Sequence, residues 1–204
     1  MTEAARIGVF GGTFDPPHVG HAIVAQDLLE GLRLDRLLVI PAPRPPHRDA
    51  VLDADVRASL VERMFRDVDA VEVSRIEFER AGPSRAVDTL REIGRRHPRA
   101  ELVLVIGADQ LAAIDTWHRF RELPVLATVA VMHREGESPA LPDGVGEFPY
   151  ITVDVARIDL SASRIRERLE AGRSIRFLVP ESIREDIERA WRDRARERQA
   201  STQC

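Results

Sequence analysis

The chain has 204 residues, of which 44% are hydrophobic and 31% charged, a balance typical of a globular protein with a substantial core. No apolar run approaches the roughly 20 residues of a membrane-spanning helix, and residues 1–6 are too short and acidic for a secretory signal. The net charge of −4 provides no positive field that would attract nucleic acid. We therefore expect one domain over residues 1–204 with no membrane or nucleic-acid partner, and a charged tail at 192–204 that is a candidate for fraying.

Hydrophobic periodicity predicts strands that alternate with helices along the whole chain. The expected strands are Arg6–Phe10, Arg36–Ile40, Val71–Phe78, Glu101–Ile106, Thr128–Met132 and Tyr150–Val155. The expected helices are His18–Gly31, Asp53–Arg66, Ala86–Arg96, Gln110–Ile114, Trp117–Leu123, Ser163–Ala171 and Glu181–Arg198, and a surface loop is expected at Glu135–Pro149. This alternation indicates a Rossmann-like α/β fold: a doubly wound, mostly parallel sheet with helices on both faces. Ligands of such sheets bind at the carboxyl ends of the strands.

The segment Gly11–His21 follows the first expected strand and has the features of a phosphate site. Two glycines allow a tight turn and close approach of a ligand to the backbone. Thr13 adds a hydroxyl group, and His18 and His21 would share one face of the first turn of the next helix. Because a strand, a glycine turn and a helix N-terminus form a common anion site, the segment predicts work on a polyphosphate.

Two simpler interpretations of the histidine pair remain. The two side chains can cap or pack the helix, or they can be half of a metal site. No nearby third and fourth ligands have zinc spacing, and the single cysteine, Cys204, ends the sequence. That one cysteine excludes an internal disulfide and is consistent with a cytoplasmic location. The chain contains no lysine, so each of its fixed cations is an arginine suited to phosphate or carboxylate.

The first motif, GGTFDPPHVGH, resembles the GGTFDPxHxGH signature of the nucleotidylyltransferase superfamily. Within the superfamily, the sequence is most similar to bacterial nicotinate-nucleotide adenylyltransferases, which make deamido-NAD and pyrophosphate from ATP and nicotinate mononucleotide. The matching segments lie in family order and span about residues 7–187. They are Pro45–Arg48, Pro83–Ser84, Asp88–Leu90, Ile106–Asp109 with Trp117, Leu160–Arg166 and Arg173–Pro180.

The resemblance implies the following roles. His18, His21 and Thr13 would be catalytic. ATP would be bound by Gly11, Gly12, Phe14, Gly107, Asp109, Ser161, Ser163 and Arg166. The pyridine nucleotide would be bound by Arg48, Arg85, Ala86, Asp109, Trp117, His118 and Arg134, and His47 would assist with phosphates. The reaction would be a direct in-line attack by a phosphate oxygen without a covalent enzyme intermediate, and Mg²⁺ would arrive on the ATP phosphates without protein ligands.

Several residues depart from the family pattern. Arg85-Ala86 replaces the usual Tyr-Thr beside the pyridine pocket, His118 replaces a tyrosine, and Ala162 replaces a serine. Arg85 could pair with a carboxylate, which would favour nicotinate over nicotinamide mononucleotide. Without the resemblance, Trp117 would be interpreted as a packing residue, and Ser161 and Asp109 as helix caps.

Three alternative functions follow from the same observations. The chain could be a related enzyme with another acceptor, either nicotinamide mononucleotide or phosphopantetheine. It could also be a non-catalytic nucleotide-binding protein on the same fold. An ordinary dinucleotide-binding dehydrogenase is disfavoured, because no GxGxxG sequence follows the first strand. The sequence leaves a homo-oligomer open.

Overall fold

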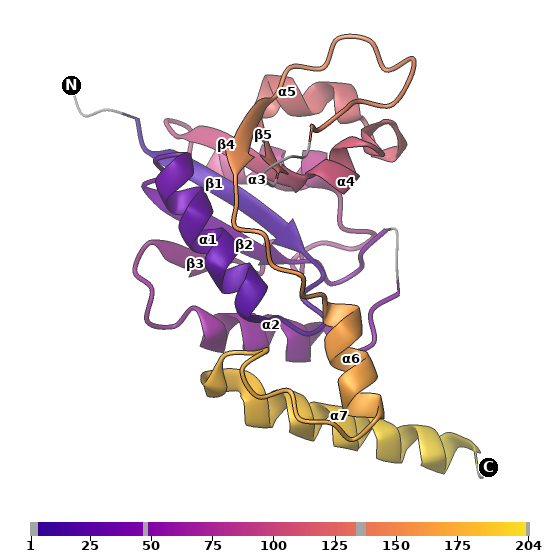
Figure 1. Cartoon of the computed structure of the whole chain (residues 1–204). Coiled ribbons are helices and arrows are strands. Elements are labelled where there is room, and N and C mark those ends of the chain that lie inside the picture. The colour runs from indigo at the N-terminus through magenta and orange to yellow at the C-terminus, as the bar shows by residue number, and fades with distance from the viewer. Residues whose placement is uncertain (1–3, 47–48, 134–137, 203–204) are drawn as a thin grey trace.

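A parallel sheet forms the centre of the molecule (Figure 1). The computed structural model describes residues 4–46, 49–133 and 138–202. Its strands are β1 (Arg6–Gly12), β2 (Arg36–Pro41), β3 (Val71–Val73), β4 (Glu101–Gly107), β5 (Thr128–His133) and β6 (Ile151–Asp154). They lie in the order β3-β2-β1-β4-β5-β6, and each neighbouring pair is parallel. The predicted doubly wound sheet is therefore confirmed, with its switch point between β1 and β4.

Helices connect the successive strands from β1 to β5, and two further helices follow β6. They are α1 (Val19–Gly31), α2 (Ala54–Met64), α3 (Ala86–Arg96), α4 (Ala108–Leu111), α5 (Leu123–Leu126), α6 (Ala162–Glu170) and α7 (Glu181–Thr202), with 3₁₀ turns at Ile114–Thr116 and Phe120–Glu122. In the described part of the chain, no helix is long and apolar enough to cross a bilayer.

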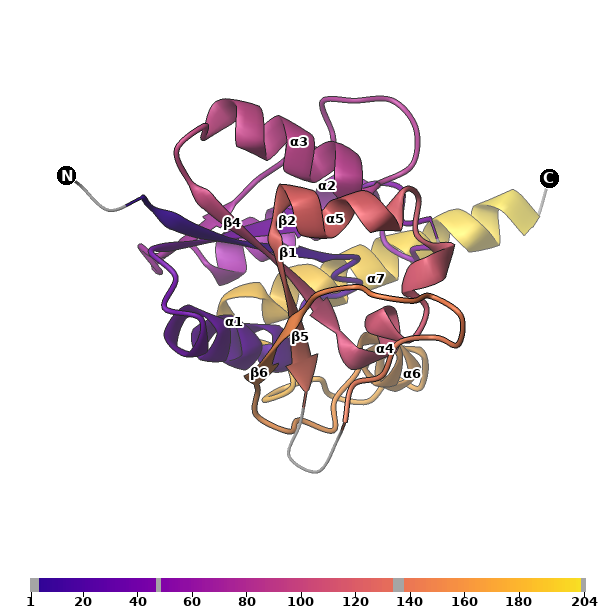
Figure 2. The same cartoon turned by 90° about the horizontal axis from the view of Figure 1, so that it is seen from above.

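Both faces of the sheet are covered, because side chains alternate between the faces along each strand. Val39 and its neighbours pack with Leu28 of α1 and Val61 of α2 on one face. Ile40 packs with Leu90 of α3 on the other face, within the cluster that also holds residues of α4 and α5. Figure 2 shows α1 and α3 on opposite sides of the strands. A sheet buried on both faces explains why its strands are continuous apolar runs.

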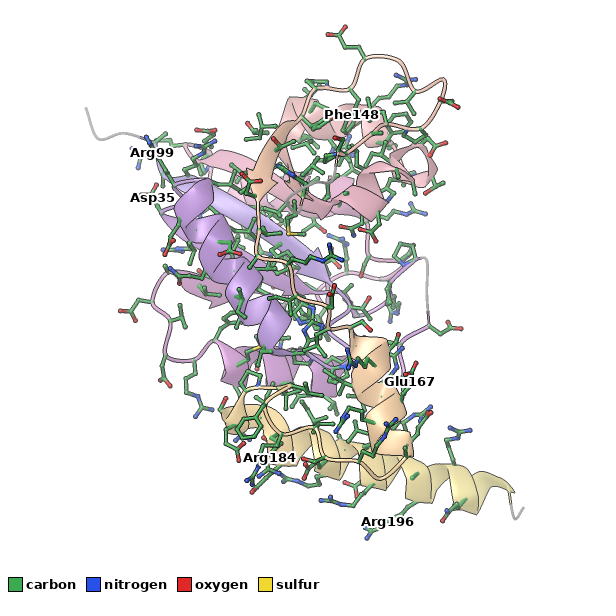
Figure 3. The ribbon with its side chains drawn as sticks, viewed as in Figure 1. Asp35, Arg99, Phe148, Glu167, Arg184 and Arg196 are labelled. Carbon is green, nitrogen blue, oxygen red and sulfur yellow. The ribbon has the colours of Figure 1, made fainter. Side chains whose placement is uncertain are left out.

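A third apolar cluster attaches the C-terminal helices to α2. Leu60 of α2 packs in this cluster with Ile165 of α6 and Ile187 of α7, and the two isoleucines are fully buried. α7 continues to Thr202, so the segment expected to fray is helical as far as it is described. Figure 3 shows Arg196, on this last part of α7, pointing away from the sheet.

The strand expected at Val71–Phe78 is too long in the prediction. β3 ends at Val73, and Ser74 makes the last hydrogen bond to β2, through its N–H to the Val39 carbonyl at 2.9 Å. The chain then turns, because Glu77 is buried against Arg80 and Thr89 rather than facing solvent from a strand. The apolar alternation at Ile76 and Phe78 therefore comes from a turn that packs on the core.

The segment 110–126 also differs from its expected two helices. α4 begins two residues earlier than predicted and ends at Leu111. Arg119 has a left-handed backbone with φ 55°, which interrupts any helix that starts near Trp117. Pro124 then lies in the first turn of α5. In the described part of the loop expected at 135–149, Val145 and Phe148 are buried and anchor the segment to the core.

Candidate functional site

The turn after β1 is made by Phe14 and not by the two glycines. Gly11 and Gly12 lie inside β1, whereas Phe14 has φ 50° in the left-handed region. A Cβ at Gly12 would lie 2.9 Å from the buried Phe14 ring, and one at Gly11 would meet no atom within 4 Å. Gly12 is therefore needed for packing, while Gly11 leaves open space at the carboxyl end of the strand.

The two imidazoles of the motif lie against one another at the start of α1. His18 is the N-cap, and His21 is in the first turn with its ring centroid 3.8 Å from that of His18. The His18 N–H donates to Nδ1 of His21 at 3.1 Å. The neutral His21 ring therefore carries its proton on Nε2, as a donor. The predicted helix start and the predicted shared face are both confirmed.

Burial keeps both imidazoles neutral. It lowers the pKa of His18 from 6.5 to about 4. It also lowers the pKa of His21 well below its ordinary value, with a smaller contribution from the neighbouring His18. The buried Nδ1 of His18 has no hydrogen-bond partner among the described residues. The pair can thus offer neutral hydrogen bonds to a ligand without supplying a fixed charge.

Two buried charged side chains hold the loops around this motif. The Asp15 carboxylate accepts hydrogen bonds from the N–H groups of Val51 at 2.6 Å and Leu52 at 2.9 Å. Arg57 of α2, only 1% exposed, donates to the Thr13 carbonyl at 2.7 Å and to three other backbone carbonyls. Sequence reasoning missed Arg57. The available signal was its place on the buried stripe of α2, four residues before Val61.

The serine-rich segment reaches the first motif through one arginine. Ser161 is the N-cap of α6 and accepts from the Arg164 N–H at 3.2 Å, which confirms its capping interpretation. Arg166 donates to the Asp15 carbonyl at 2.6 Å and to the Ser163 hydroxyl at 3.0 Å. The structure therefore brings Arg166, with Ser163 bonded to it, to the turn after β1.

The end of β4 lies beside the end of β1, as expected at the switch point. The Asp109 carboxylate folds back on Gly107, where an added Cβ would lie 2.5 Å from its Oδ1. Trp117 is partly buried and packs on the core, and His118 is exposed. Core packing therefore accounts for part of the placement of Trp117, in agreement with its interpretation as a packing residue.

The segment that departs most from the family begins α3. Arg85 is the N-cap and Ala86 the first helical residue. The Arg85 carbonyl accepts from Arg80 at 3.2 Å and from the Thr89 hydroxyl at 3.1 Å, next to the buried Glu77. Within the described residues, no hydrogen bond or ion pair engages the Arg85 guanidinium. The backbone of Arg85 is thus held by the hydrogen bonds of its carbonyl, and its guanidinium has no partner among the described residues.

His47, Arg48 and Arg134 lie outside the described residues. Over residues 4–46, 49–133 and 138–202, no group of three or more His, Cys, Asp or Glu side chains is arranged to hold a metal ion. A cleft of about 730 Å³ lies between α2 and α7, and no predicted site residue lines it.

Comparisons with known proteins agree with this arrangement. Residues 9–168 match the family model described as cytidylyltransferase-like. A protein of Exiguobacterium sibiricum is 41% identical over 90% of this chain and 96% of its own length, and one of Thermus thermophilus is 39% identical over 90% and 97%. Both are named probable nicotinate-nucleotide adenylyltransferase. The solved Plasmodium falciparum nicotinic acid mononucleotide adenylyltransferase complexed with NaAD has a TM-score of 0.67 at 16% identity, covering 81% of this chain and 84% of that one.

The class that the fold and the strand-end site define is a Rossmann-like nucleotide-binding protein with an imidazole pair at its switch point. The family match and the similar proteins identify one family within this class. The chain belongs to the cytidylyltransferase-like family and, within it, to the nicotinate-nucleotide adenylyltransferases.

The contact between Gly20 and His18 yields a first prediction. A Cβ at Gly20 would lie 2.9 Å from Nδ1 of His18, so Gly20→Ala should displace that ring and lower kcat at least tenfold in a pyrophosphate-release assay. Gly94→Ala is the matched control, because its Cβ would meet only Leu102 Cδ1 at 4.0 Å. It should keep wild-type kcat and gain ~0.5–1 kcal/mol of stability in urea unfolding. A wild-type kcat in Gly20→Ala would show that turnover does not depend on the position of the His18 ring.

The lowered pKa of His18 predicts a loss of stability in acid. The unfolded chain binds a proton near pH 6.5, but the folded chain binds it only near pH 4. The contribution of the neutral His18 to the free energy of unfolding is therefore complete above pH 6.5 and is lost as the pH falls toward 4. It amounts to at most ~3 kcal/mol. Urea unfolding between pH 7 and 4 should show a shallower decline for His18→Gln than for wild type. Equal declines would contradict burial of a neutral ring.

Proposed function

We propose that this chain transfers the adenylyl group of ATP to nicotinate mononucleotide, giving deamido-NAD and pyrophosphate. A phosphate oxygen of the mononucleotide forms a bond to the α-phosphorus of ATP, and the bond from that phosphorus to the bridging oxygen breaks. Phosphate is already a competent nucleophile, so the reaction needs no protein nucleophile, and positioning and charge stabilisation carry the catalysis. The observation that carries the proposal is the stacked His18–His21 pair beside the turn to which Arg166 is hydrogen-bonded.

Each part of the site has a role in this proposal. Thr13 and the backbone of Gly12–Phe14 contact the reacting phosphates, and Gly11 leaves room for them. His18 and His21 donate hydrogen bonds as charge develops on the leaving pyrophosphate. Ser161, Ser163 and Arg166 hold the triphosphate. The Arg166 guanidinium supplies the positive charge that the neutral imidazoles do not.

Mg²⁺ fits this site as an ion carried by the nucleotide. The described residues offer no carboxylate or imidazole cluster that would hold it, which supports coordination by the ATP phosphates. When bound, the ion supplies charge neutralisation on the phosphoryl oxygens. We also propose that the reaction takes place in the cytoplasm, in line with the single cysteine.

The acceptor would bind between the ends of β4 and β5 and the start of α3. Gly107 ends β4 and Asp109 lies in α4, with the ribose hydroxyls as partners for the Asp109 carboxylate. Trp117, His118 and the start of α3 would surround the pyridine ring, with Arg48 and Arg134 as further contacts. The Arg85 guanidinium, which has no partner among the described residues, supports recognition of a carboxylate on that ring.

The activity itself gives the next prediction. Purified protein with ATP and Mg²⁺ should release pyrophosphate with nicotinate mononucleotide, and should release it much less efficiently with nicotinamide mononucleotide or phosphopantetheine. His21→Ala should lower kcat by about a hundredfold or more, the scale of one lost transition-state donor. His97→Ala, at the end of α3 and outside the proposed site, serves as the control. No release with any acceptor would favour a non-catalytic nucleotide-binding protein.

The role of Arg85 is tested by selectivity and not by total activity. Arg85→Ala should lower kcat/KM for nicotinate mononucleotide about tenfold or more, on the scale of a lost charge-assisted hydrogen bond, and change the value for nicotinamide mononucleotide little. Arg95→Ala on the exposed side of the same helix should leave both values unchanged. An unchanged ratio in Arg85→Ala would show that another residue selects the acceptor.

A further inference from the structure

Arg57 is a buried cation outside every motif of the family resemblance. Its guanidinium contacts backbone from three segments: the turn after β1, the turn after β2 and the loop before α2. It donates to the carbonyls of Thr13 at 2.7 Å, Ala42 at 2.8 Å, Leu52 at 3.1 Å and Pro43 at 3.3 Å. The turns after β1 and β2 begin at the carboxyl edge of the sheet, where the phosphates are expected to bind.

Two carboxylates offset the charge of the buried Arg57. Burial lowers the Arg57 pKa, and the negative charges of Asp15 and Asp53 oppose that change. Arg166 also lies near Asp15, with its Nη1 3.8 Å from the carboxylate Oδ2. The Asp15 carboxylate therefore interacts with both guanidinium groups, and the cation in direct contact with the Thr13 carbonyl is Arg57.

The Thr13 carbonyl connects Arg57 to the proposed site. The peptide unit that carries this carbonyl also carries the Phe14 N–H, and in a trans peptide the two groups point in opposite directions. The one cis peptide bond in the described chain is Asp15–Pro16. No protein acceptor takes the Phe14 N–H among the residues the structure describes. A cation on the carbonyl polarises the amide and strengthens its N–H as a donor.

We propose that Arg57 is a positioning residue for phosphate binding. It orients and polarises the Thr13–Phe14 peptide so that the Phe14 N–H donates to a nucleotide phosphate, and it holds the turn after β2 beside that peptide. This inference rests on the proposed function, because it places the ATP phosphates at the turn after β1.

Lysine is the informative replacement for Arg57. Its ammonium keeps the charge, but it is a point donor that cannot reach four separated carbonyls at once. Arg57→Lys therefore tests the geometry of the guanidinium with the charge retained. Arg184→Lys is the matched control, because Arg184 has a largely buried side chain that bonds Glu181 and Glu188 on α7, away from the motif.

The experiment measures inorganic pyrophosphate binding by calorimetry and the steady-state kinetics of both substrates, with urea unfolding as a check on folding. In Arg57→Lys we expect the Kd for pyrophosphate to rise at least tenfold, and the KM for ATP to rise more than the KM for nicotinate mononucleotide. Arg184→Lys should leave these values within twofold of wild type. A folded Arg57→Lys with wild-type Kd and kcat/KM would overturn the proposal.

A measurement on the unaltered protein keeps the test decisive if Arg57→Lys does not fold. The amide proton of Phe14 should move downfield in NMR spectra as pyrophosphate saturates the protein, because a new hydrogen bond deshields it. An unmoved Phe14 signal at saturation would overturn the proposal. Wild-type protein that binds pyrophosphate but turns over no acceptor would instead refute the proposed function, and the Phe14 test would still stand.

Discussion

The positions of the loops after β1 and β2 depend on one buried guanidinium, that of Arg57, which is surrounded by backbone carbonyls. A buried charge is strongly unfavourable unless hydrogen bonds and an opposite charge compensate it. Arg57 meets this requirement with carbonyls from three loops and with Asp15 nearby. Asp15 in turn needs the N–H groups of the loop before α2. These requirements can be met together only when the loops after β1 and β2 meet at one point, which is where we propose that the phosphates bind.

Local patterns account for the parts of the fold that the sequence predicted well. β1, β2, β3, β4 and β5 begin at the predicted residues, since each is an apolar run that follows a polar segment. The start of α1 next to His18 was also predicted, because prolines end the preceding turn and the histidine spacing fits one helical face. The parallel order follows from the alternation of strands and helices.

Contacts between distant residues account for what the sequence did not predict. Glu77 turns the chain out of β3 because its partner Thr89 lies on α3, and no local signal reports that pairing. The glycine pair predicted a turn, but the backbone of Phe14 makes the turn two residues after Gly12, and the buried Phe14 ring occupies the space beside Gly12. The helical pattern of α2 could have indicated that Arg57 is buried, but nothing in the neighbouring sequence shows that four carbonyls converge on it.

The bond between Arg166 and the Asp15 carbonyl joins residues that lie 151 positions apart in the sequence. During synthesis, the sheet and the histidine pair can therefore form before α6 exists, and the nascent protein then lacks Arg166 at the turn after β1. The same separation matters in the mature protein, because α6 is held mainly by the apolar cluster it shares with α2 and α7. A transient release of that cluster would move Arg166 away from the proposed site while the sheet stays intact. Loss of activity on heating would then precede loss of strand structure, so that enzymatic and spectroscopic melting curves separate.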